Sequence, residues 1–78
     1  MNVIPLSDAP QGEVLYVNEI HSKGAIRRRF QDIGITEGTN IVSVIKSPLG
    51  DPCAYLVCGS LIAIRNNDAK NILVSLRR

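Results

Sequence analysis

The chain of 78 residues has few of the residue types on which catalytic and metal sites depend. It contains one histidine, no tryptophan, one phenylalanine and two tyrosines. A Ser-His-Asp or Cys-His arrangement would have to use His21, which has no acidic neighbour along the chain closer than Glu19. Neither G-x-x-x-x-G-K-[ST] nor G-x-G-x-x-G occurs, so both common nucleotide-binding loops are missing. We therefore expect a binding module and not an enzyme.

The two cysteines are placed badly for a disulfide or a metal site. Cys53 and Cys58 bracket the segment AYLV, which has the composition of a strand. Five steps along a strand separate two residues by roughly 16 Å and turn them to opposite faces. A disulfide needs Cα atoms within about 7 Å of each other. With one histidine and scattered carboxylates, the chain also lacks the ligands of a closed metal site. We expect two reduced cysteines, no metal site and no cofactor.

Long apolar runs and strong net charge are absent as well. No run approaches the ~20 residues that span a bilayer, and the start, MNVIPLSDAP, has neither a basic leader nor an apolar signal region. We expect a complete, cytoplasmic protein without direct membrane insertion. The net charge of +2 is too small to indicate nucleic-acid binding, and stacking aromatics are few. We expect no nucleic-acid partner.

What the chain does have is a series of short strand-like segments separated by turn residues. Residues 7–12 have the composition of a loop. The segments rich in Val, Ile and Tyr are 13–20, 39–47, 53–58, 61–65 and 72–76, and the last alternates at period two. Imperfect alternation in 13–20 is compatible with a bulge. The order predicts one mostly-β domain over residues 1–78, a small closed barrel of about five strands. The last strand and strand 53–58 are candidate edges, and a homo-oligomer is compatible with them.

One segment has the period of an α-helix. Ile26, Phe30 and Ile33 fall at i, i+4 and i+7 and form a single apolar stripe. Ser22 is a candidate N-cap, and Gly34 stands where a left-handed C-terminal cap belongs. The helix thus follows the first strand, and its stripe should face the core.

Turn residues separate the remaining elements. SPLGDP, residues 47–52, must turn, because Pro48 fixes φ and Gly50 frees it. Gly59 and Ser60 predict a tight turn between strands. The segment NNDAK, with an Asn cap, predicts barely one helical turn before the last strand.

The segments RRRF, QDIGI, TEG and SPLGDP, followed by GSLIAIRNNDAKNILV, together resemble the FeoA family across nearly the whole chain. Within the tail, Gly59, Ala63, Arg65 and Ala69 fit the family pattern. The chain departs from it at Phe30, where the family usually has an aliphatic residue, and at Glu37, where many members have Pro.

The resemblance implies an SH3-like barrel with the helix in the first long connection. It also implies an accessory role in bacterial ferrous-iron uptake and, at the level of the family, transition-metal-ion binding. The implied partner is the membrane transporter FeoB, bound and modulated at its cytoplasmic GTP-binding region. The alternative is a stand-alone SH3-like interaction module linked to iron-dependent transcriptional regulation, since a similar domain ends some regulators of that kind.

Two surface features are candidates for partner binding. Arg27 and Arg28 form, with Arg29, a basic cluster that is either a solvated helix face, a patch for acidic side chains, or a nucleic-acid contact. The stem of Arg29 is expected along the core. Leu49, at the tip of the proline-bounded loop, either caps the end of the barrel or is a rigid apolar anchor for a partner. We select Arg27, Arg28 and Leu49 as the candidate partner-binding residues.

Overall fold

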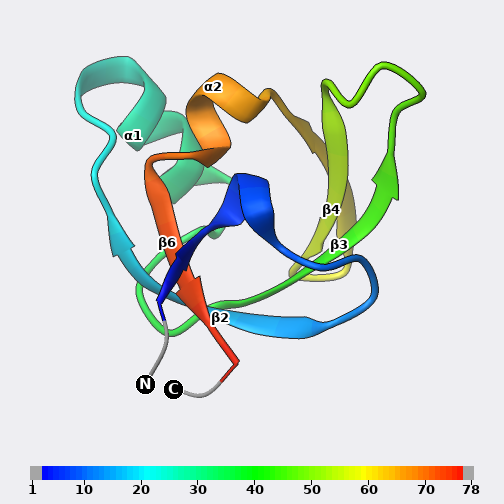
Figure 1. Cartoon of the computed structure of the whole chain (residues 1–78). Coiled ribbons are helices and arrows are strands. Elements are labelled where there is room, and N and C mark those ends of the chain that lie inside the picture. The colour runs from blue at the N-terminus through cyan, green and yellow to red at the C-terminus, as the bar shows by residue number, and fades with distance from the viewer. Residues whose placement is uncertain (1–2, 77–78) are drawn as a thin grey trace.

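Six antiparallel strands form one curled sheet in the computed structural model, which describes residues 3–76 (Figure 1). Their order across the sheet is β1-β6-β2-β3-β4-β5. The strands are β1 (Ile4–Pro5), β2 (Val14–Ile20), β3 (Asn40–Lys46), β4 (Cys53–Val57), β5 (Ser60–Ile64) and β6 (Ile72–Ser75). The helical elements are η1 (Leu6–Asp8), α1 (Gly24–Asp32) and α2 (Asn66–Ala69). The expectation of a mostly-β barrel with one helix after the first long strand is confirmed.

The first strand and the segment after it were missed in the sequence. β1 has only two residues, paired with β6, and two residues are too few to show a period. The loop expected over 7–12 is partly wrong, because its first two residues belong to the 3-10 helix η1. Leu6 and Ala9 on either side are almost fully buried. An apolar side chain at each end of a short polar segment therefore pins the segment to the core.

The edges of the sheet also differ from the expectation. β6 lies between β1 and β2, and β4 lies between β3 and β5, so neither is an edge strand. The outermost strands of the described chain are β1 and β5, which do not pair with each other. The short elements α2 and η1 pack together instead. The barrel is therefore a curled sheet and not a closed ladder of hydrogen bonds.

Register shifts interrupt two of the strand pairings. β2 shifts against β6 between Val17 and Glu19, which confirms the bulge that the sequence allowed there. β3 shifts against β4 between Ser43 and Ile45. A bulge adds a residue to one strand and increases local twist. These two positions help the sheet to curl.

A tight turn joins β4 to β5 one residue earlier than expected. Val57 pairs with Ser60, which leaves Cys58 and Gly59 as the two turn residues. Both have positive φ, 52° and 80° respectively, as a type I′ hairpin requires. The predicted strand 53–58 consequently ends at Val57. Cys58 is the one non-glycine residue with positive φ among the described residues.

Helix α1 begins differently from the prediction but ends where it was predicted to end. Its N-cap position is held by Lys23, without a side-chain cap, so the Ser22 cap was wrong. At the other end Gly34 has φ of 95°. Its N–H donates to the Gln31 carbonyl at 3.1 Å, and the Ile35 N–H donates to the Phe30 carbonyl at 2.8 Å. This pair of bonds is the Schellman arrangement that a glycine cap favours.

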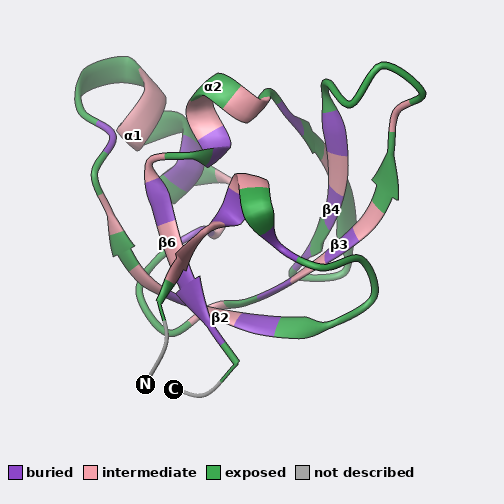
Figure 2. Ribbon diagram, in the orientation of Figure 1, coloured by how far each residue is buried: buried purple, intermediate pink, exposed green. Residues whose placement is uncertain are grey.

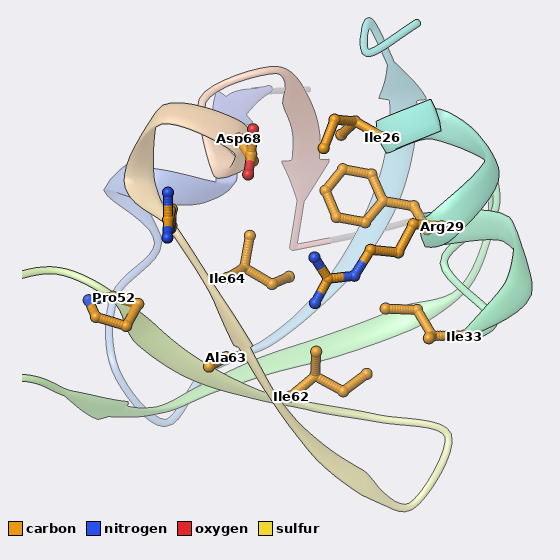
Figure 3. A pocket seen from close by; sticks show the side chains of 10 residues that line it. Ile26, Arg29, Ile33, Pro52, Ile62, Ala63, Ile64 and Asp68 are labelled. Atoms are coloured by element: carbon orange, nitrogen blue, oxygen red, sulfur yellow. The ribbon is translucent and has the colours of Figure 1, made fainter. Parts of the chain in front are cut away.

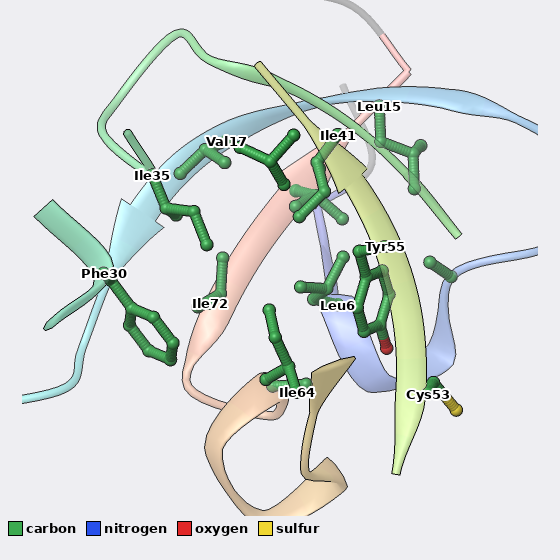
Figure 4. Packing of buried hydrophobic residues seen from close by; sticks show 14 residues of the cluster. Leu6, Leu15, Val17, Phe30, Ile35, Ile41, Cys53, Tyr55, Ile64 and Ile72 are labelled. Atoms are coloured by element: carbon green, nitrogen blue, oxygen red, sulfur yellow. The ribbon is translucent and has the colours of Figure 1, made fainter. Parts of the chain in front are cut away.

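The core fills the interior of the curled sheet (Figures 2 and 4). Phe30 is the residue of α1 that reaches it, while Ile26 and Ile33 pack against it with partial exposure. The predicted helical stripe is thus confirmed. The cluster consists of Leu6, Ala9, Leu15, Val17, Phe30, Ile35, Ile41, Cys53, Tyr55, Val57, Ile64, Ala69, Ile72 and Val74. Leu76, the last residue of the expected strand 72–76, lies beyond the end of β6 and is 61% exposed.

No helix within residues 3–76 is both long enough and apolar enough to cross a membrane.

Candidate functional site

The loop between β3 and β4, residues 47–52, is held in place by Asn66, the first residue of α2. The Gly50 N–H donates to the Ser47 carbonyl at 2.8 Å and closes the turn. Asn66 Nδ2 donates to the Gly50 carbonyl at 2.7 Å, and the Asn66 N–H donates to Asp51 Oδ1 at 2.9 Å. Asn66 was predicted as a cap, but Arg65 occupies the N-cap position. Asn66 instead ties the loop to the first turn of α2.

Leu49 projects from this anchored loop. It is 94% exposed, the highest value among the large apolar residues that the structure describes. The side chain therefore does not cap the barrel end, which was one of its two predicted roles. Because the loop is fixed by hydrogen bonds, a partner that contacted Leu49 would lose little further conformational entropy.

A groove of about 410 Å³ lies between α1 and β5, with one end at the loop (Figure 3). The sequence reasoning did not find it, because its walls come from three regions of the chain that are far apart: α1 with its C-cap, the loop, and the segment from β5 into α2. The lining residues are Ile26, Arg29, Phe30, Ile33, Pro52, Ile62, Ala63, Ile64, Arg65 and Asp68. A partial signal was the apolar run in β5, where Leu61 is 57% exposed.

The groove runs along β5, where Ile62, Ala63 and Ile64 line it. Ile62 and Ile64, two residues apart, lie on one face of the strand and point towards α1 in Figure 3. β5 pairs with β4 alone, so its other edge carries backbone groups without strand partners in the described chain. An extended peptide could add to this edge as a further strand.

The walls of the groove combine an apolar floor with positive charge at the rim. In Figure 3 the Arg29 side chain extends from α1 towards Ile64 across the groove, and the residue is exposed. Arg65 is a second cation in the lining, and Asp68 is the one acidic residue there. Two guanidinium groups against one carboxylate favour an acidic ligand.

The candidate arginines lie in different surroundings. Arg27 is half-buried, and its Nη1 donates to the Ile20 carbonyl at 2.7 Å, which ties α1 to the end of β2. Arg28 is exposed. Neither lines the groove. Their roles in partner binding remain predictions.

The titratable side chains that the structure describes lie apart from one another for the most part. No group of three or more His, Cys, Asp or Glu residues could hold a metal ion within residues 3–76. Exposed His21 contacts Glu19, with 3.1 Å between Nε2 and Oε2. Cys53 is buried, Cys58 is exposed, and both are free thiols. Burial, followed by the nearby Cys53 thiol and the Asp51 charge, raises the pKa of Tyr55 to about 12.

A row of apolar side chains crosses the sheet over β2, β3, β4 and β5. Val14 pairs with Val42, Val42 with Leu56, and Leu56 with Leu61, so four strands contribute one position each. Three of the four are 42–57% exposed. An exposed apolar patch of this kind is a second surface at which the protein could meet another molecule.

Comparison with solved structures shows the same architecture in several bacterial proteins. The FeoA protein from Chlorobium tepidum is 31% identical, with a TM-score of 0.89 over 96% of this chain and 71% of that one. The FeoA-like protein from Clostridium acetobutylicum is 32% identical, with a TM-score of 0.87 over 100% of this chain and 91% of that one.

A third structure names the architecture. Zinc-complexed FeoA from Stenotrophomonas maltophilia, described as a prokaryotic SH3 domain protein, is 30% identical. Its TM-score is 0.74, over 90% of this chain and 87% of that one. The expected SH3-like fold is thus confirmed. A manganese-dependent transcriptional repressor matches at 16% identity, which shows a shared fold alone.

The sequence comparison gives the family directly. No curated protein matches the chain. The family model described as the FeoA domain matches residues 4–76, which is nearly the entire chain and includes every wall of the groove. The chain belongs to the FeoA family.

Proposed function

We propose that this protein is a non-enzymatic accessory protein of bacterial ferrous-iron uptake. It acts in the cytoplasm, where it binds and modulates the membrane transporter FeoB at its GTP-binding region. Membership of the FeoA family supports the iron-transport role. The groove beside β5 supports a binding role and is the observation that carries the proposal.

The groove fits a segment of the partner in extended conformation. The free edge of β5 supplies backbone hydrogen-bonding groups, and the apolar floor accepts one or two side chains. Arg29 and Arg65 outnumber Asp68 in the lining, so an acidic residue on the bound segment would gain a charge-assisted hydrogen bond. Leu49 adds an apolar contact beyond the Pro52 end of the groove.

A binding measurement with charge-reversal variants tests this proposal. The cytoplasmic region of FeoB is titrated with the wild-type protein and with Arg29→Glu, which places a repulsive charge in the groove. We expect Arg29→Glu to weaken binding by at least about tenfold, since breaking one charged interface pair has an effect of that size or larger. Lys70→Glu, outside the lining, changes the net charge equally and should leave the affinity within about twofold.

Arg28→Glu separates the groove from the outward face of α1. If Arg28→Glu weakens binding and Arg29→Glu does not, the partner sits on the helix face and the groove assignment is wrong. If the wild type does not bind FeoB at all but co-purifies with DNA-binding proteins, the transcription-linked alternative replaces the proposal. Addition of the protein to the GTPase region, with GTP hydrolysis as readout, measures whether binding also modulates activity.

A further inference from the structure

The hairpin of β4 and β5 determines which backbone groups reach the free edge of β5. Ser60 pairs with β4 next to the two-residue turn, so it belongs to a hydrogen-bonded pair. Opposite residues of an antiparallel ladder alternate between hydrogen-bonded and non-hydrogen-bonded pairs. The pairing continues in register, so Ile62 and Ile64 are bonded to β4. The backbone N–H and carbonyl groups of Leu61 and Ala63 therefore point away from β4, to the free edge.

This alternation also explains how three consecutive residues of β5 line the groove. Ile62 and Ile64 turn their side chains towards α1, whereas the side chain of Ala63 points to the opposite face of the strand. At the free edge Ala63 presents its backbone. The groove therefore has one backbone donor and one backbone acceptor between two apolar side chains, which is what a further strand requires.

The two arginines of the lining have no anionic partner of their own. Among residues 3–76, neither Arg29 nor Arg65 forms an ion pair with a carboxylate, although Asp68 is part of the same lining. Arg29 extends towards Ile64 in Figure 3, and Arg65 is the next residue after Ile64 in the chain. Both arginines are exposed. Positive charge therefore gathers at the Ile64 end of β5, where it can pair with an acidic ligand.

The other end of the groove is apolar. Ile62 lies two residues before Ile64, which is roughly 7 Å along a strand. Ile33, at the C-cap of α1, lies towards the same end as Ile62 in Figure 3. Both isoleucines are half-buried, so they still expose apolar surface that a ligand can cover.

We propose that the groove recognises an extended segment with the pattern acidic residue, any residue, apolar residue, which adds to β5 as an antiparallel strand. The middle residue pairs with Ala63, and its two neighbours turn their side chains into the groove. In the antiparallel direction the acidic residue comes first and lies opposite Ile64, beside the arginines. The apolar residue follows and lies opposite Ile62.

The existing sheet supports this direction. Strands β1 to β6 pair with one another in antiparallel direction throughout the described chain, and antiparallel pairing is slightly more stable per residue than parallel pairing. The inference deepens the proposed function and rests on it for the use of the groove as a docking site, but not for the identity of the partner.

Short synthetic peptides in one Gly/Ser/Thr background test the pattern on this protein alone. The peptides contain Glu-Thr-Val, the uncharged Gln-Thr-Val, the reversed Val-Thr-Glu, or Glu-Val-Thr, in which the two key residues are adjacent. Each is titrated into isotopically labelled protein while amide NMR shifts are followed. We expect Glu-Thr-Val to bind at least about tenfold more tightly than each of the others, since a hydrogen bond between charged groups contributes at that level. Equal affinities, tightest binding of Val-Thr-Glu, or no binding of Glu-Thr-Val would overturn the proposal.

Amide exchange in the same complex reports the register. Exchange at Ala63 should slow when Glu-Thr-Val binds, because its N–H gains a partner, whereas the Ile62 and Ile64 amides are already bonded to β4 and should change less. Slowing at Ile62 and Ile64 without slowing at Ala63 would contradict strand addition at this edge.

Variants of the arginines test the acidic position through a ratio that loss of folded protein does not change. In Arg29→Gln and in Arg65→Gln, the preference for Glu-Thr-Val over Gln-Thr-Val should fall below about threefold. Lys70→Gln, outside the lining, removes the same charge and should keep the preference near tenfold. A preference that is unchanged in both arginine variants would show that the arginines do not read the acidic residue.

Competition against FeoB separates this inference from the proposed function. Excess Glu-Thr-Val peptide should release the cytoplasmic region of FeoB from the protein. If the peptide binds as predicted but does not release FeoB, the pattern stands and the docking of FeoB in the groove is wrong. If Arg29→Glu weakens FeoB binding while the four peptides bind alike, the docking stands and the pattern is wrong.

Discussion

Substitution of Gly34 by alanine tests how the end of α1 is set. Gly34 has φ of 95°, and a Cβ on it would lie 2.8 Å from Cys58 Sγ. A non-glycine residue in left-handed backbone costs about 1–2 kcal/mol, and turning the exposed Cys58 side chain out of the contact adds up to about 1 kcal/mol. We expect Gly34→Ala to lower the free energy of unfolding by about 1–3 kcal/mol, as measured by urea denaturation.

A double-mutant cycle with Cys58→Gly separates the two contributions. Cys58→Gly removes the sulfur from the contact and places glycine at a turn position with φ of 52°. In the Cys58→Gly background, Gly34→Ala should lower the free energy of unfolding only by the cost of the left-handed backbone, about 1–2 kcal/mol. If the two backgrounds lose the same amount within about 0.5 kcal/mol, the contact with Cys58 is not present. If Gly34→Ala has no effect in either, the left-handed conformation is wrong.

Three further predictions concern the core, the loop and the thiols. Because burial raises the pKa of Tyr55 to about 12, above its ordinary value near 10, the folded state keeps the proton longer than the unfolded state does. The contribution of neutral Tyr55 to the free energy of unfolding should therefore be fully present below pH 10 and should fall by up to about 1.4 kcal/mol per pH unit between pH 10 and the folded-state pKa. Urea unfolding at a series of pH values should show this extra slope in the wild type, and Tyr55→Phe should lack it. Asn66→Ala removes the hydrogen bond to the Gly50 carbonyl and should lower the free energy of unfolding by about 1 kcal/mol and increase amide exchange in the loop, whereas unchanged exchange would show that Asn66 does not hold it. A thiol reagent should modify exposed Cys58 in the native protein and buried Cys53 only after unfolding; rapid reaction of both would contradict the packing of β4.

The features predictable from the sequence are those that local periodicity or turn chemistry determines. Ile26, Phe30 and Ile33 repeat at helical spacing, and Gly34 follows them, so the helix and its end were readable. β1 could not be predicted, because two residues show no period and its strand conformation comes from pairing with β6. The Ser22 cap was wrong because the helix starts one residue later than a Ser22 cap requires, with Lys23 at the N-cap position.

The candidate site was less predictable than the fold. Leu49 could be placed at a loop tip because prolines and glycine define its loop, but the sequence left open whether it caps the barrel or faces solvent, and the structure places it in solvent. The groove depends on Arg29, Ile62 and Asp68 coming together from three elements, and no local sequence pattern predicts that these residues are neighbours in space. The hydrogen bonds from Asn66 to the loop are likewise tertiary contacts between segments about 15 residues apart.

The central claim, that an extended segment of FeoB adds to the free edge of β5, is tested most directly by mapping the bound surface. Labelled protein is titrated with the cytoplasmic region of FeoB while backbone amide shifts and hydrogen exchange are followed. We predict shifts concentrated in β5, α1 and residues 47–52, with slower exchange for β5 amides as they gain strand partners. Shifts confined to β1 and β6, or no shifts at saturating FeoB, would contradict the account.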